Sequence, residues 1–128
     1  MKKIYCLWLM CLLAGVVAAQ SVKELYIFHT NDMHSRIEPF ATYFPDSVLA
    51  GKAGMLRRAT FVKEQRREHK DLLLFDSGDF SQGSPYYNMF KGEVEIKMMN
   101  EMGYDAGTIG NHEFDFGLDN MARLFKMA

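Results

Sequence analysis

The sequence predicts an α/β fold in the order β, α, β, α, β, α, built around a parallel sheet. Short apolar runs with the length and composition of buried strands occur at residues 25–28, 72–75 and 106–109. Longer segments with apolar residues at helical spacing occur at residues 55–68, 94–102 and from about 118. Because continuous apolar strands that alternate with helices are typical of parallel sheets, we expect helices on both faces of the sheet.

Each predicted element follows from its own residues. The run Leu25–Phe28 is apolar and partly aromatic, as in a buried strand. Residues 38–54 hold two prolines and two glycines and are expected to form a loop. The helix at 55–68 has its apolar positions at Met55, Leu56, Ala59 and Val62. Its basic residues are expected to form a solvated face in preference to a phosphate patch, namely Arg57, Arg58, Lys63, Arg66 and Arg67.

The second half of the chain repeats this alternation. The apolar run 72–75 predicts the second strand, and 106–109 predicts the third. Between them, a helix over 94–102 would place Val94, Met98, Met99 and Met102 on one face. The last helix is predicted from the spacing of Leu118, Met121, Ala122 and Phe125. The methionines on these helices are explained as core residues by their spacing, without a copper site.

Length and composition limit the class of protein. The chain has 128 residues, of which 48% are hydrophobic and 24% charged, and this is ordinary for a globular protein of one domain at most. The formal net charge of −1 offers no basic footprint for nucleic acid. We therefore expect a single α/β unit that does not bind nucleic acid.

The first 19 residues have the pattern of a secretory signal peptide. Lys2 and Lys3 precede an apolar run over residues 4–17, and small residues lead to an expected cleavage after Ala19. A membrane anchor is the alternative, but the run is shorter than the roughly 20 residues that span a bilayer. Cys6 and Cys11 lie inside the run and would be removed with it. The expected product, residues 20–128, is periplasmic or secreted, has no stable membrane anchor and uses no thiol chemistry.

Polar residues that suit a metal site follow all three predicted strands. These stretches are Asp32-x-His34, Gly78-Asp79 and Gly110-Asn111-His112-Glu113. Right-handed crossovers would bring them to one edge of the sheet, where ligands bind in open α/β folds. A carboxylate two residues from an imidazole can chelate a metal, Asp79 can bridge two ions, and Asn111 offers a carbonyl oxygen. Mixed oxygen and nitrogen donors suit manganese, zinc, iron or magnesium.

Each stretch also has a simpler interpretation. Asp32 could cap a turn, Asn111 could be a turn residue with a left-handed backbone, and Asp115 could be the N-cap of the last helix. Glu113 could serve structure or chemistry. His29 is expected to be a core or edge residue, and His69 to lie in solvent or at the end of a helix. Chance alone explains poorly why so many such residues fall at the ends of strands.

These residues resemble the N-terminal part of the calcineurin-like metallophosphoesterases. The resemblance is strongest to the secreted bacterial 5′-nucleotidase / 2′,3′-cyclic phosphodiesterase branch, and it covers residues 24–128. The matching stretches are His29-Thr30-Asn31-Asp32-Met33-His34, Asp76-Ser77-Gly78-Asp79 with Gln82-Gly83-Ser84-Pro85, Gly103-Tyr104-Asp105-Ala106, and Gly110-Asn111-His112-Glu113-Phe114-Asp115-Phe116-Gly117. This implies the N-terminal half of a four-layer metallophosphoesterase sandwich, truncated after its third β-α unit.

The resemblance also implies roles for site residues. Two divalent metal ions would be bound by Asp32, His34, Asp79 and Asn111. Asn111 and His112 would contact the substrate phosphate, and His112 would stabilise the transition state or protonate the leaving oxygen. Asp115 would orient His112, and these two residues would be the catalytic ones. The implied reaction is hydrolysis of a nucleotide or another phosphate ester by a hydroxide that the two metals activate.

The resemblance implies further parts that this sequence does not match. The second half of the domain would supply more histidine ligands, and a C-terminal domain would bind the nucleoside. We therefore expect this chain alone to be incomplete, with an uncovered apolar surface, unless a separately encoded C-terminal part joins it. The alternative function is a non-catalytic truncated remnant with at most weak metal binding. A nuclease or an enzyme that cleaves sulfur esters is also compatible with the motifs.

Overall fold

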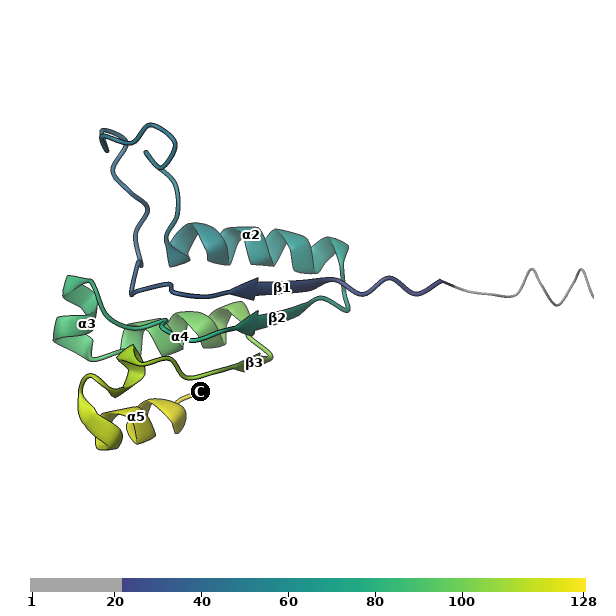
Figure 1. Cartoon of the computed structure of the whole chain (residues 1–128). Helices are drawn as coiled ribbons and strands as arrows, with labels where there is room; N and C mark the ends of the chain where they lie inside the picture. Colours follow the sequence, from purple (N-terminus) through teal and green to yellow (C-terminus); the bar gives the residue numbers. More distant parts are fainter. Residues whose placement is uncertain (1–21) are drawn as a thin grey trace, which may run out of the picture.

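The computed structural model describes residues 22–128, so the predicted signal peptide lies outside the described part. Figure 1 shows the elements in chain order. They are β1 (Ile27–Thr30), α2 (Met55–Glu68), β2 (Leu73–Asp76), α3 (Pro85–Phe90), α4 (Glu93–Met102), β3 (Ala106–Gly107), the 3₁₀ helix η1 (His112–Phe114) and α5 (Gly117–Phe125). Within residues 22–128, no helix is both long enough and apolar enough to cross a membrane.

The three strands form a parallel sheet in the order β1-β2-β3, which confirms the predicted α/β class. Ile27 pairs with Leu73 and Thr30 with Asp76. The first strand thus begins two residues later than predicted, and Leu25 lies before it with 54% of its surface exposed. Pairing with β2 sets the bounds of this strand, because backbone hydrogen bonds define a ladder whatever the polarity of the side chains.

Helices α2 and α4 pack against each other and share one hydrophobic core with the sheet. Phe28 and its partner Leu74 join this core, whereas Ile27 on the opposite face of the sheet is 55% exposed. The strand order explains this. Both crossovers advance across the sheet in the same direction, so two right-handed connections place both helices on the same side. The prediction of helices on both faces is therefore wrong for residues 22–128.

Buried methionines fill much of the core between the helices and the sheet. Met55 of α2 is completely buried, and Met99 and Met102 of α4 are buried beside Ile96. This agrees with their predicted role as core residues.

The last helix buries a different face from the predicted one. Leu118 is 65% exposed and Phe125 39%, whereas Leu124 is buried at 1%. Leu124 packs against Gly92, the residue that precedes α4. A Cβ added to Gly92 would lie only 2.7 Å from Cδ1 of Leu124. The helical spacing was correct, but contact with the start of α4 selects which side of α5 is buried.

Helix α3 was not predicted as an element. Pro85 occupies its first turn, and the Oγ of Ser84 accepts a hydrogen bond from the backbone N–H of Tyr87 at 3.4 Å. A serine N-cap followed by proline is a helix-start signal, but six residues are too few for a visible apolar period. By contrast, residues 38–54 lack helix and strand as predicted, and this loop projects away from the sheet (Figure 1).

Glu95 of α4 gives a testable prediction about stability. Its side chain is completely buried, and neither carboxylate oxygen has a hydrogen-bond partner within residues 22–128. Since a buried polar group without a partner costs about 1–3 kcal/mol, we expect Glu95→Met to raise the midpoint of thermal unfolding. The exposed Glu101 of the same helix provides the control, and Glu101→Met should leave the midpoint nearly unchanged. A lower midpoint for Glu95→Met would contradict this view of the core.

Candidate metal centre

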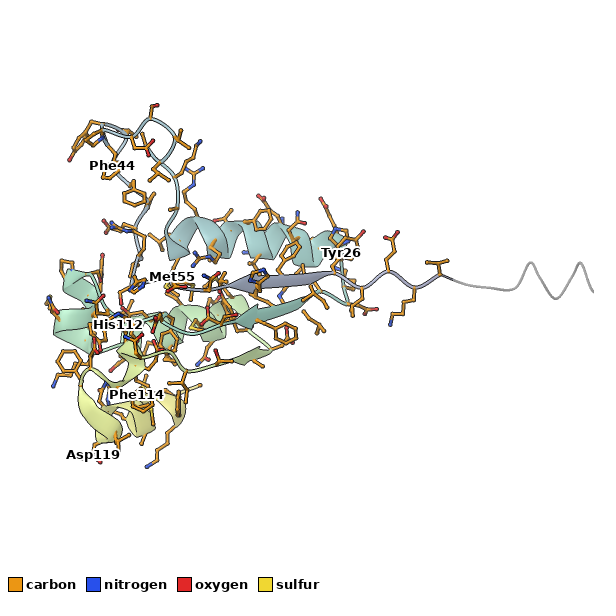
Figure 2. The ribbon with its side chains drawn as sticks, viewed as in Figure 1. Tyr26, Phe44, Met55, His112, Phe114 and Asp119 are labelled. Carbon is orange, nitrogen blue, oxygen red and sulfur yellow. The ribbon has the colours of Figure 1, made fainter. Side chains whose placement is uncertain are left out.

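The loops that follow β1 and β2 lie side by side at the carboxyl edge of the sheet. The backbone N–H of Asp32 donates to the carbonyl of Gly78 at 3.0 Å, and that of His34 donates to the carbonyl of Asp79 at 3.0 Å. Figure 2 shows the side chains that gather at this end of the sheet, with His112 from the third loop among them. The predicted meeting of the post-strand loops at one edge is therefore observed.

The third loop is joined to the second by the carboxylate of Glu113. Its Oε2 accepts hydrogen bonds from the backbone N–H groups of Asp79 at 3.0 Å and Gly110 at 2.7 Å. Its Oε1 accepts one from the N–H of Ser81 at 3.1 Å, and the residue is only 1% exposed. The geometry therefore gives Glu113 a structural role.

Two glycines allow these loops to approach closely. A Cβ on Gly78 would lie 2.6 Å from the backbone nitrogen of Gly110, and a Cβ on Gly110 would overlap the carboxylate of Asp79. Gly78 also has a φ of 95°, which favours glycine. Asp79 itself has a φ of 54°, as uncommon for a non-glycine residue as the 49° of Asp32 and the 45° of His34. Such left-handed backbone often occurs at functional sites.

Three side chains form a possible metal site. One donor atom each from His34, Asp79 and His112 lie within 4.8 Å of one another, and all three residues are half-buried. The imidazole rings of His34 and His112 have centroids 5.2 Å apart. Two imidazole nitrogens and a carboxylate oxygen suit a divalent ion of borderline softness, so this donor set fits a divalent metal ion.

The structure places the other predicted ligands beside this cluster. The Oδ1 of Asp32 lies 3.6 Å from the Nε2 of His34, and its Oδ2 accepts a hydrogen bond from the side-chain amide of Asn31. Asn111 is exposed and precedes η1, where its carbonyl accepts the N–H of Phe114. The roles of Asp32 and Asn111 as ligands remain predictions, whereas His112, predicted only for catalysis and substrate binding, lies within the cluster.

Asp115 lies against the imidazole of His112. Its Oδ2 is 2.9 Å from the Nδ1 of His112, and this hydrogen bond is the main reason why the pKa of His112 is raised above its ordinary value. The charges of Asp115, Asp79 and Glu113 act in the same direction, while desolvation opposes them. The alternative role of Asp115 as N-cap of the last helix is wrong, because α5 begins at Gly117 after Phe116.

Sequence reasoning gave no role to two further residues at the site. The Oε1 of Gln82 lies 3.3 Å from the Nδ1 of His34, so Gln82 can help to orient that ring. Asp76, buried at the end of β2, accepts hydrogen bonds from Thr30 Oγ1 at 2.6 Å and from the N–H of Gly78 at 2.9 Å. Burial is the main reason why the pKa of Asp76 is raised. Both residues lie in the stretches that carry the family resemblance, and this is the sequence signal that could have pointed to them.

The two remaining histidines lie outside the site. His29 is exposed on the open face of the sheet. His69 ends helix α2 as its C-cap and stacks on Tyr26 with ring centroids 3.6 Å apart, as expected for a residue at a helix end.

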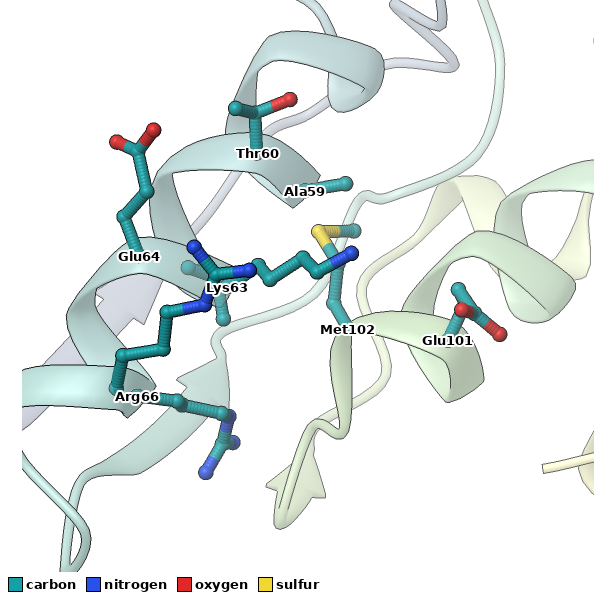
Figure 3. A pocket seen from close by; sticks show the side chains of 9 residues that line it. Ala59, Thr60, Lys63, Glu64, Arg66, Glu101 and Met102 are labelled. Atoms are coloured by element: carbon teal, nitrogen blue, oxygen red, sulfur yellow. The ribbon is translucent and has the colours of Figure 1, made fainter.

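A separate groove of about 700 Å³ runs between α2 and α4 (Figure 3). It is lined by basic and acidic side chains, including Lys63, Arg66 and Glu101. The guanidinium of Arg66 donates to the carbonyls of Leu72 and Gly103 and lies 3.5 Å from the carboxylate of Asp105. Arg66 therefore ties α2 to the chain around β2 and β3 and is not free to bind a phosphate.

Replacing the carboxylate of Glu113 tests its role in joining the loops. In Glu113→Gln, an amide nitrogen that cannot accept replaces one of the two oxygens that bind backbone N–H groups. Since hydrogen bonds to a charged group contribute about 1.5–3 kcal/mol each, we expect the free energy of unfolding to fall by about 2–4 kcal/mol in urea titrations. Glu64→Gln, at an exposed position of α2, is the control. Equal stabilities of the two variants would refute the structural role.

Replacing Asp115 tests the cause of the raised pKa of His112. In Asp115→Asn we expect this pKa to fall toward 6.5, measured by an NMR pH titration of the chain with chelator present. Because the folded pKa is raised, protonated His112 stabilises the fold below its unfolded pKa. That contribution is lost as the pH rises through the folded pKa, and Asp115→Asn should weaken this dependence. Asp119→Asn, in the first turn of α5, should leave the titration unchanged.

Known proteins resemble this chain along most of its described length. The sequence matches the family described as Calcineurin-like phosphoesterase over residues 25–127. It is 44% identical over 108 residues to the snake venom 5′-nucleotidase of Crotalus adamanteus, covering 82% of this chain and 18% of the venom protein. It is 42% identical over 100 residues to the 5′-nucleotidase of Bos taurus, covering 77% of this chain and 17% of the bovine protein. The chain thus spans less than a fifth of the length of these curated relatives.

Solved structures show the same relationship. The 5′-nucleotidase precursor from Thermus thermophilus has a TM-score of 0.68 and 33% identity, covering 80% of this chain and 20% of that one. A calcineurin-like phosphoesterase from Bacillus subtilis has a TM-score of 0.63 and 32% identity, covering 81% of this chain and 34% of that one. Because the family match includes every strand and all three post-strand loops, this chain belongs to the calcineurin-like phosphoesterase family.

Proposed function

We propose that this chain carries the metal-binding part of a phosphoric-ester hydrolase of the 5′-nucleotidase type, which acts in nucleotide catabolism. The observation that carries the proposal is that His34 and Asp79, two proposed ligands, converge with His112, the proposed proton donor, within 4.8 Å at the carboxyl edge of the sheet. The 5′-nucleotidases among the relatives support nucleotides as the substrate class. The signal-peptide pattern and the venom relative support a periplasmic or secreted location.

The donor set fits divalent metal ions. Asp32, His34, Asp79 and Asn111 are the proposed ligands of two ions, and Asp79 is the proposed bridge. Bound ions of this kind lower the pKa of a water molecule and neutralise charge on phosphoryl oxygens. Mixed nitrogen and oxygen donors are compatible with manganese, zinc, iron or magnesium.

His112 is the proposed proton donor to the leaving oxygen. Its Nδ1 is engaged by Asp115 at 2.9 Å, which leaves Nε2 as the ring atom for the substrate. The raised pKa of His112 favours the protonated imidazole, the form that a general acid requires. Asn111, exposed next to His112, is the proposed second contact to the phosphate.

We further propose that another polypeptide segment completes the active centre, such as a separately encoded C-terminal part. Four proposed ligands leave most positions around two ions to water, and the side chain of Asp32 is 58% exposed. Ile27 of β1 and Leu25 just before it, 55% and 54% exposed, also leave an apolar surface for a partner to cover. The same observations favour the second candidate, a non-catalytic remnant that binds one metal weakly.

Metal binding and hydrolysis can be measured separately. We expect Mn²⁺ to bind the chain in calorimetry, and Asp79→Asn to weaken binding tenfold or more because it removes a carboxylate charge from the cluster. Asp71→Asn, an exposed change after α2, should bind as the wild type does. We expect the chain alone to release negligible phosphate from 5′-AMP with Mn²⁺. Robust hydrolysis that disappears in His112→Ala would contradict incompleteness, and absent Mn²⁺ binding would contradict the metal centre.

A further inference from the structure

Tyr87, on helix α3, contacts His112 of the candidate metal centre. Its side chain is only 4% exposed, and its hydroxyl donates a hydrogen bond to the backbone carbonyl of His112 at 3.0 Å. The two residues are 25 positions apart, so this bond joins α3 to η1. Tyr87 lies outside the residues for which a catalytic or metal-binding role is proposed above.

Hydrogen bonds engage three groups of His112: its backbone carbonyl, bonded by Tyr87, its backbone N–H and its ring Nδ1. The backbone N–H of His112 donates to Oδ1 of Asp79 at 3.1 Å, and its Nδ1 lies 2.9 Å from Asp115. Its carbonyl accepts from both the hydroxyl of Tyr87 and the N–H of Asp115, which uses both lone pairs of that oxygen. Among residues 22–128, Tyr87 donates the one side-chain hydrogen bond to this carbonyl.

Tyr87 is itself held firmly. Its N–H is capped by Ser84, and its carbonyl accepts the N–H of Lys91 at 2.7 Å, so both ends of the short helix α3 are closed around it. Its ring packs against Phe116 with centroids 5.0 Å apart. Since Phe116 follows Asp115 directly, the tyrosine contacts the chain on both sides of the carboxylate that orients the imidazole.

The hydroxyl of Tyr87 remains a donor across the neutral range. Burial is the main cause that raises the pKa of Tyr87 to about 12, and the charges of Asp115, Glu113 and Glu95 add to it. A phenol with such a pKa keeps its proton while His112 changes its charge. The hydroxyl can therefore donate to the carbonyl of His112 whichever charge the imidazole carries.

We propose that Tyr87 is a positioning residue that fixes the backbone of His112, and through it the imidazole, in the candidate metal centre. The functional meaning of this contact rests on the role proposed for His112, but the contact can be tested without metal or substrate. A backbone held at its carbonyl restricts the ring, because a single methylene joins the imidazole to the backbone and Asp115 holds the ring at Nδ1.

Helix α3 offers a matched control for the experiment. The neighbouring Tyr86 donates its hydroxyl to Oε1 of Glu38 at 2.8 Å, on the exposed surface and away from His112. Tyr87→Phe and Tyr86→Phe therefore each remove one phenolic hydrogen bond from the same helix. Comparing their thermal unfolding midpoints measures the general loss of stability.

The deciding measurement is the ¹H–¹⁵N spectrum of the His112 imidazole in the full chain with chelator present. We expect Tyr87→Phe to shift the ring nitrogen signals and speed exchange of the Nδ1 proton, while Tyr86→Phe leaves both unchanged. Unchanged signals in Tyr87→Phe, or equal changes in both variants, would overturn the proposal. If Tyr87→Phe does not fold, the wild-type chain should show a slowly exchanging Tyr87 hydroxyl proton with a nuclear Overhauser contact to η1, and its absence would overturn the proposal.

Mn²⁺ affinity provides the functional readout. We expect Tyr87→Phe to weaken Mn²⁺ binding about threefold to tenfold, because the backbone N–H of His112 donates to Oδ1 of Asp79, a proposed ligand. That range corresponds to the loss of one neutral hydrogen bond, and Tyr86→Phe should leave the affinity unchanged. If the wild-type chain binds no Mn²⁺, the proposed function fails, while the imidazole spectrum still decides the positioning role. If it binds Mn²⁺ and Tyr87→Phe leaves both affinity and spectrum unchanged, the positioning role alone fails.

Discussion

The candidate metal centre depends on one buried carboxylate. Glu113 accepts backbone hydrogen bonds from Asp79, Ser81 and Gly110, and so joins the loops that follow β2 and β3. These N–H groups lie at the close approach of two glycine-containing turns, where no strand ladder can satisfy them. Because Glu113 is the next residue after His112 in η1, the interaction that joins the loops also sets the place of the imidazole relative to Asp79. The side chain of Glu113 therefore both joins the two loops and positions His112 in the candidate metal centre.

The sheet determines how the other loop reaches this point. Backbone hydrogen bonds continue beyond the paired strands from Asp32 to Gly78 and from His34 to Asp79. They hold Asp32, His34 and Asp79 in a left-handed backbone, which non-glycine residues adopt at a cost and which persists where surrounding contacts demand it. The helices stabilise the sheet from one face only. The opposite face stays exposed around Ile27, so the same topology that assembles the site leaves one side of the sheet uncovered among residues 22–128.

The predictions failed where contacts between distant elements decide the outcome. Apolar residues at Leu118 and Phe125 have correct helical spacing, yet Leu124 is buried because it fits beside Gly92 at the start of α4. The first strand was expected at 25–28, but its partner β2 places the ladder at Ile27–Thr30. Helix α3 is too short for periodicity to show, and its importance lies in the contact between Tyr87 and His112, which sequence spacing does not reveal.

The amino-acid sequence by itself determined the alternation of strands and helices, the polar stretches after each strand and the family that those stretches resemble. These are properties of neighbouring residues, since local periodicity and motif spacing are written along the chain. Tertiary structure alone decided that the helices cover one face, that His112 joins His34 and Asp79 in one cluster, and that Glu113 bonds to three backbone N–H groups. Each depends on distances between segments that lie far apart along the chain, and only the packed fold sets those distances.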